Sequence, residues 1–146
     1  MKEQVLNALQ ALGFQLEEME DLGYGFRYEG IDYLYMPNDN DDDFLSISVP
    51  GLVEITEENA ATTYKVMDRI NATVKYVKAN KMGRGMWMFY ERELFGGEDL
   101  EILITRMILH LESAVNFFRN ALERSMDDDE ESEDNVDTNE NNDDDE

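Results

Sequence analysis

The spacing of apolar residues predicts three helices separated by two groups of strands. Between Lys2 and Leu12, Val5, Leu9 and Leu12 recur at intervals of three and four residues, which is the spacing of one helical face. The longest pattern of this kind runs from about Glu98 to Arg124 and predicts a long last helix. Its apolar stripe consists of Leu100, Leu103, Ile104, Met107, Ile108, Leu111, Ala114, Val115, Phe118, Ala121 and Leu122.

Aromatic residues mark the first group of strands. Tyr24, Phe26 and Tyr28 alternate with other residues at a strand's period of two. Two more strands are predicted at 31–36 and 44–49, so this group is expected to form a three-stranded antiparallel meander. The stretch 14–20 fits either a short strand or the approach to one.

A helix and a hairpin are predicted after Pro50-Gly51, which is expected to end the first group of strands. Thr56 is placed to cap that helix, which should run to Asn71. Its expected buried side consists of Ala60, Tyr64, Met67 and Ile70. The hairpin is predicted at 73–79 and 85–94, and Asp99 is placed to cap the last helix.

Helices segregated against an antiparallel sheet define an α+β fold, here in the order α-βββ-α-ββ-α with the helices on one face. The length of 146 residues predicts one domain, expected at 1–126. Residues 127–146 contain thirteen acidic residues, no Lys or Arg and one aliphatic side chain, Val136. They cannot bury enough apolar surface to offset their ordering entropy, so a disordered acidic tail is expected there.

Composition argues against several classes of function. The chain has no cysteine, so it has neither disulfides nor thiolate metal sites. The N-terminal MKEQVLNALQ contains no continuous hydrophobic run, so we expect no signal peptide, no membrane span and a cytoplasmic location. The one histidine, His110, lies at the margin of the apolar stripe without a second histidine or a thiol to pair with. We therefore expect no enzyme and no cofactor.

Two charged segments are candidate ligand sites, and neither is expected to bind a ligand. A calcium loop starting at Asp39 would need glycine at its sixth position and glutamate at its twelfth, where Phe44 and Pro50 stand, so no metal site is expected. The one basic cluster consists of Lys75, Lys78, Lys81 and Arg84. Since the chain carries a net charge of −23, phosphate backbones repel it, and we expect no nucleic-acid partner.

Apolar residues on both sides of single strands indicate a protein-binding surface. Tyr33 and Tyr35, and likewise Trp87 and Phe89, alternate with further apolar residues, so one sheet face should remain uncovered. Ile102 and Leu109 lie opposite the main stripe of the last helix and favour a contact with a second subunit in a homodimer. These six residues are the candidate partner-binding residues. The alternative is that tyrosine rings merely line a half-exposed sheet and that Ile102 and Leu109 are ordinary surface residues.

The whole layout resembles a known family. The segments that show the resemblance are the first helix ending near Leu12-Gly13, the run FRYEGIDYLYMPNDNDDDFLSISVPG, the helix ITEENAATTYKVMDRINATVKY, the hairpin with MWMFYERE and the long last helix. Over residues 1–126 the chain resembles the YbjN-like proteins, bacterial domains that share the fold of type III secretion chaperones. The resemblance implies a cytoplasmic, often dimeric domain without catalytic residues. Secretion chaperones of this fold bind an extended segment of a client protein, whereas YbjN-like proteins are described as candidate regulators.

These observations together predict a non-enzymatic protein-binding module of chaperone-like fold. It would bind an extended segment or a surface of a partner protein. The alternative is a regulatory protein that acts through a small ligand or a transient partner and has no chaperone activity.

Overall fold

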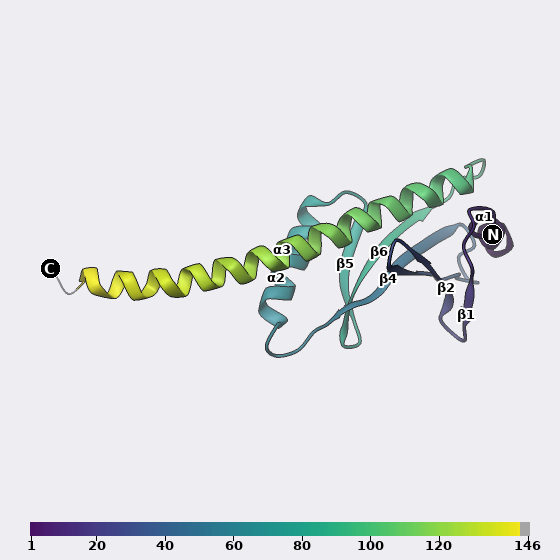
Figure 1. The fold of residues 1–146 in the computed structure, drawn as a ribbon. Coiled ribbons are helices and arrows are strands. Elements are labelled where there is room, and N and C mark those ends of the chain that lie inside the picture. The colour runs from purple at the N-terminus through teal and green to yellow at the C-terminus, as the bar shows by residue number, and fades with distance from the viewer. Residues whose placement is uncertain (144–146) are drawn as a thin grey trace.

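The computed structural model describes residues 1–143 and confirms the α+β fold (Figure 1). Its helices are α1 (Lys2–Ala11), α2 (Ala60–Thr73) and α3 (Leu100–Asp143). Its strands are β1 (Glu17–Met19), β2 (Gly23–Tyr28), β3 (Ile31–Tyr35), β4 (Phe44–Glu54), β5 (Val77–Met82) and β6 (Gly85–Glu93). The described part of the chain thus has the predicted order of elements, with β1 added in the segment whose structure the sequence left open.

The strands form one antiparallel sheet in the order β1-β2-β3-β4-β6-β5. β4 and β6 are the central pair, and α2 lies in the connection that leads from β4 to the outer strand β5. The long helix α3 contacts β4, β5 and β6 and crosses them along much of its length (Figure 1). This arrangement leaves two faces of the sheet with different surroundings.

All three helices pack into one core against the same face of the sheet. Their buried residues include Val5 and Leu9 of α1, Val66 and Ile70 of α2, and the stripe of α3 around Met107. On the strands, every second side chain joins this core, as the alternation of a pleated sheet requires. These strand residues are Phe26, Ile31, Tyr33, Tyr35, Leu45, Ile47, Val49, Val77, Ala79, Met86, Met88 and Tyr90.

Local hydrogen bonds explain where the helices begin and end. Gly13 has a φ of 95°, and the N–H groups of Gly13 and Phe14 donate to the carbonyls of Gln10 and Leu9, which is a Schellman motif. Asp99 caps α3 as predicted, because its carboxylate accepts the N–H of Ile102 at 3.2 Å. Thr56 exchanges two hydrogen bonds with Asn59 one turn ahead of α2.

Two predictions about the middle of the chain are wrong. Pro50-Gly51 does not end the strand: β4 continues to Glu54, and its register against β6 shifts between Val49 and Val53. A bulge of this kind absorbs residues that cannot join the ladder, so the strand bends instead of stopping. On α2, Tyr64 is exposed, and Thr63 and Val66 join Met67 and Ile70 on the buried side.

The last helix is longer than its apolar stripe predicted. The backbone of α3 remains helical to Asp143 and does not end near Arg124. No Gly or Pro occurs after Gly97, so nothing in the sequence breaks the helix. The boundary at 126/127 between a domain and a disordered acidic tail stays a prediction, and residues 144–146 lie outside the described residues. None of the described helices is both long and apolar enough to cross a membrane.

Candidate partner-binding surface

The face of the sheet that points away from the helices has a separate apolar cluster. Leu34 of β3 and Phe89 of β6 are buried, yet neither belongs to the core beneath the helices. Ser48 of β4 pairs with both and lies between them in the sheet. We call this face, with Leu34, Ser46, Ser48, Trp87 and Phe89, the outer face.

Two aromatic rings dominate the outer face of β6. The rings of Trp87 and Phe89 stack with their centroids 5.9 Å apart and an interplanar angle of 17°. The ammonium group of Lys78, on the neighbouring β5, lies 5.6 Å from the centroid of Phe89 and forms an ion pair of 3.0 Å with Glu91. Lys78 and Glu91 therefore cover Phe89, whereas Trp87 stays half-buried beyond them.

A groove with a volume of about 460 Å³ lies beside Trp87 on this face. Its apolar lining includes Met19, Leu22, Leu34 and Pro50, and Met19 and Leu22 are large apolar residues exposed to solvent. Gly25 has no side chain to fill the groove, and a Cβ there would meet the Met19 sulfur at 3.3 Å. The bulge in β4 places Pro50 at the edge of this groove. The groove has the size and the apolar character of a binding site.

Known structures share this arrangement of helices and sheet. YbjN from E. coli, whose crystal structure is described as that of a candidate transcription regulator, superimposes with a TM-score of 0.61 at 15% identity, covering 84% of this chain and 92% of that chain. The chain has a YbjN-like fold. An uncharacterized protein from Methanothermobacter thermautotrophicus superimposes with a TM-score of 0.56 at 14% identity, covering 84% of this chain and 97% of that chain. No protein-family model and no curated protein matches the sequence.

The YbjN-like fold divides the six candidate residues among three places. Trp87 and Phe89 lie on the outer face, where Trp87 is half-buried and Phe89 is buried. Ile102 and Leu109 are exposed on α3, at a different surface from the outer face. Tyr33 and Tyr35 lie in the core beneath the helices, although Tyr33 also contributes to the lining of the groove. Trp87 lines the groove as well, whereas Phe89 only stacks on Trp87.

Placing Tyr33 and Tyr35 at an exposed surface was wrong. Both are 1% exposed, and the Tyr33 hydroxyl donates to the carbonyl of Ile108 in α3 at 3.5 Å. Burial raises the pKa of Tyr35 to about 12 and raises the pKa of Tyr33 further. The alternation of side chains along β3 explains this burial. Because Tyr33 and Tyr35 point into the core, Leu34 between them points to the outer face.

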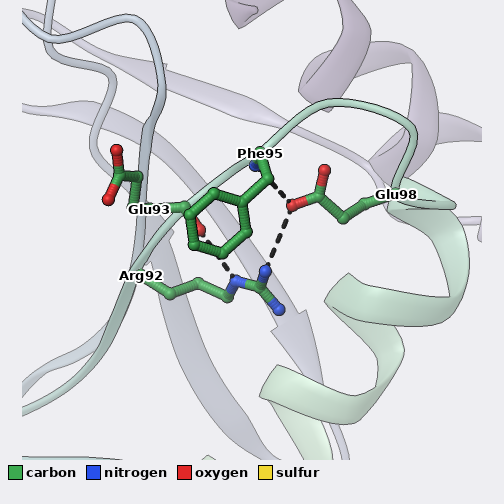
Figure 2. A network of polar contacts seen from close by, with 4 residues as sticks. All are labelled: Arg92, Glu93, Phe95 and Glu98. Carbon is green, nitrogen blue, oxygen red and sulfur yellow. Dashed lines mark hydrogen bonds and ion pairs between the residues drawn. The ribbon is translucent and has the colours of Figure 1, made fainter.

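Phe95 is a prominent exposed residue that the sequence interpretation missed. It is 82% exposed and lies in the loop between β6 and α3. Figure 2 shows the Glu98 carboxylate between Arg92 and Phe95, accepting hydrogen bonds from the Arg92 guanidinium at 3.1 Å and the Phe95 N–H at 2.9 Å. The adjoining Gly96 and Gly97, both with positive φ, were the signal for a tight turn that could present this ring.

The ring of His110 packs against two aromatic rings. Its ring contacts the rings of Tyr76 and Tyr90, with centroid distances of 5.1 and 5.9 Å. Among the described residues, no three acidic or histidine side chains are grouped so that they could hold a metal ion.

Proposed function

We propose that the protein is a non-enzymatic protein-binding module that holds a segment or a surface of a partner protein against its outer face. The observation that carries this proposal is the apolar groove beside Trp87, on a side of the sheet that no described helix covers. Tryptophan is among the residues that contribute most to protein–protein affinity, and a neighbouring methionine is common at adaptable binding surfaces.

The charges of the outer face support a protein partner. The chain carries 35 acidic residues, and two acidic residues of this face form ion pairs. Arg27 pairs with Asp32 at 3.2 Å on the groove side, and Lys78 pairs with Glu91 near the aromatic rings. An apolar groove on a highly acidic protein favours an apolar protein segment over a nucleic acid or a free anion.

The location and the assembly are part of the same proposal. We place the protein in the cytoplasm as a homodimer, with Ile102 and Leu109 on the exposed side of α3 as the contact between copies. A role as a chaperone for a client protein fits the outer face, since an extended client segment can lie in an open groove.

A regulatory protein that binds a small ligand is the alternative. A second hollow of about 510 Å³ favours it, because carboxylates and backbone groups line much of this hollow. Its lining consists of Met1, Gln4, Asp42, Asp43, Leu94, Gly96, Gly97, Glu98 and Leu100. Under this alternative, a substitution at Trp87 leaves function unchanged.

The test compares what the wild-type protein and a Trp87→Ala variant retain in affinity purification from the native cell. The control is Tyr64→Ala, which removes an exposed aromatic ring from α2 without touching the outer face. We expect a partner that binds to wild type and to Tyr64→Ala but not to Trp87→Ala. Equal retention by all three proteins would contradict the proposal.

A further inference from the structure

Three exposed apolar side chains follow one another along the outward side of α3. Phe95, Ile102 and Leu109 are 82%, 56% and 46% exposed. Ile102 and Leu109 are seven residues apart, which is nearly two helical turns, so they lie on the same side of the helix. Phe95 precedes Ile102 by the same interval, in the loop that leads into α3.

The backbone that presents Phe95 is held in place before any partner arrives. The Glu98 carboxylate accepts hydrogen bonds from the Phe95 N–H and the Arg92 guanidinium (Figure 2). The N–H of the neighbouring Leu94 donates to the Asp43 carbonyl at 2.7 Å. Leu94 itself is buried. Because this backbone is already fixed, only the Phe95 side chain loses conformational entropy when it binds.

An apolar pocket lies at the other end of the same surface, beside Leu109. Its volume is about 160 Å³, and it is lined by Leu12, Phe14, Tyr28, Thr105, Ile108 and Leu109. Phe14 and Tyr28 meet edge to face there, with ring centroids 6.1 Å apart. A cavity of about 150 Å³ accepts benzene, so this pocket has room for a phenyl ring between aromatic walls.

We propose that a second copy of this chain occupies the pocket: two α3 helices pack antiparallel about a two-fold axis at Ile102, and Phe95 of each copy fills the pocket beside Leu109 of the other. A two-fold axis requires a self-complementary surface. Ile102 meets its own counterpart at the axis, and the projecting ring and the pocket lie at equal sequence distances on either side of it. This inference rests on the homodimer proposed above.

The charges on this surface allow two acidic chains to meet. The exposed residues along the outward side of α3 are Ile102, Thr105, Arg106, Leu109, Ser113 and Asn116, and the exposed Glu101 lies at the flank of this side, one turn before Thr105. Asp99 and Arg106 are also seven residues apart and share one flank of this side. The two-fold axis at Ile102 places Arg106 of each copy level with Asp99 of the other, so opposite charges face each other twice.

Light scattering coupled to size-exclusion chromatography tests the ring and the pocket. At about 50 µM protein, we expect wild type to elute at twice the chain mass of 17.0 kDa. Phe95→Ala should elute at the single-chain mass, whereas Tyr64→Ala, which truncates another exposed aromatic residue, on α2, should behave as wild type. A circular-dichroism spectrum in the far ultraviolet that matches wild type will show that the variant is folded, and its melting temperature should fall as the association is lost.

A cysteine scan tests the axis. The chain has no cysteine, so Ile102→Cys introduces a single thiol, which should form a disulfide with its counterpart under mild oxidation. Tyr64→Cys is the control and should remain uncrosslinked. A wild-type dimer that persists in Phe95→Ala would overturn this inference and leave the proposed homodimer standing. A wild type of single-chain mass would overturn both, and neither result bears on partner binding at the outer face.

Discussion

Trp87 and Phe89 lie two residues apart on β6 and stack on the face of the sheet opposite all three helices. The intervening residue, Met88, points into the core and is fully buried. The strand therefore stabilises the core with one set of side chains and builds an aromatic surface with the other. This double use of β6 places the only tryptophan of the chain beside an open groove.

Gly23 is predicted to be irreplaceable at the start of β2. A Cβ added there would collide with the carbonyl oxygen of Tyr35 and approach the Met36 Cα at 3.2 Å. Backbone atoms cannot swing aside, so the β2–β3 hairpin would have to shift. We expect Gly23→Ala to lower the free energy of unfolding by about 3 kcal/mol or more, measured by urea denaturation.

Gly25→Ala is the matched control on the same strand. Its Cβ would meet the end of the flexible Met19 side chain at 3.3 Å, which can move. A loss below about 1 kcal/mol is expected. Equal losses in the two variants would show that the contact between β2 and β3 at Gly23 is looser than described.

Ile108 is predicted to be a major contributor to the core. It is 3% exposed in the middle of the α3 stripe, and its carbonyl accepts the Tyr33 hydroxyl. Ile108→Ala should cost roughly 2–5 kcal/mol of unfolding free energy, through lost burial and a cavity. Met82→Ala, at an exposed position of β5, should cost less than about 1 kcal/mol in the same denaturation series. A similar small loss in both variants would mean that α3 packs on a different side.

Long periodic patterns predicted the fold well. The eight stripe residues of α3 from Ile104 to Ala121 are buried as expected, because so long a run of apolar residues at helical spacing leaves one choice of inward face. β1 could not be predicted, since its three residues are all exposed and carry no alternation. The continuation of β4 beyond Pro50 depends on its pairing with β6, which a single strand's sequence does not contain.

The candidate site was predictable only in part. The sequence showed that β3 and β6 are apolar on both sides, but each alternation allows either side to face inward. Trp87 and Phe89 lie on the outer face, with Phe89 buried, whereas Tyr33 and Tyr35 lie beneath the helices. The groove also needs Met19 and Leu22 from the β1–β2 hairpin and Pro50 from β4, and the approach of these two segments follows only from the assembled sheet.

Glu98 should titrate below its ordinary range. The hydrogen bond from the Phe95 N–H, followed by other backbone N–H groups and Arg92, lowers the pKa of Glu98 from its ordinary value of 4.5. The ionised form therefore stabilises the loop at pH above 4.5, and this contribution is lost as the pH falls through the lower, folded pKa. The amide resonance of Phe95, followed by NMR during acidification, should shift with a midpoint below 4.5.

The control for this titration is Glu98→Gln, which removes the carboxylate and should abolish the transition at the Phe95 amide. Neighbouring acidic residues such as Glu93 and Asp43 remain in that variant, so any transition that persists belongs to them. A wild-type midpoint at or above 4.5 would contradict the described hydrogen bonds of the loop.

Fluorescence of Trp87 tests the proposed binding surface most directly, because no other tryptophan contributes to the signal. The measurement is iodide quenching of the tryptophan emission, before and after addition of a partner retained by wild type and lost from Trp87→Ala. For a partner fragment without tryptophan, we predict a shift of the emission to shorter wavelength and a marked loss of quenching at equal molar amounts, because the partner covers the indole. Unchanged emission and unchanged quenching with the partner fully bound would contradict binding at the outer face.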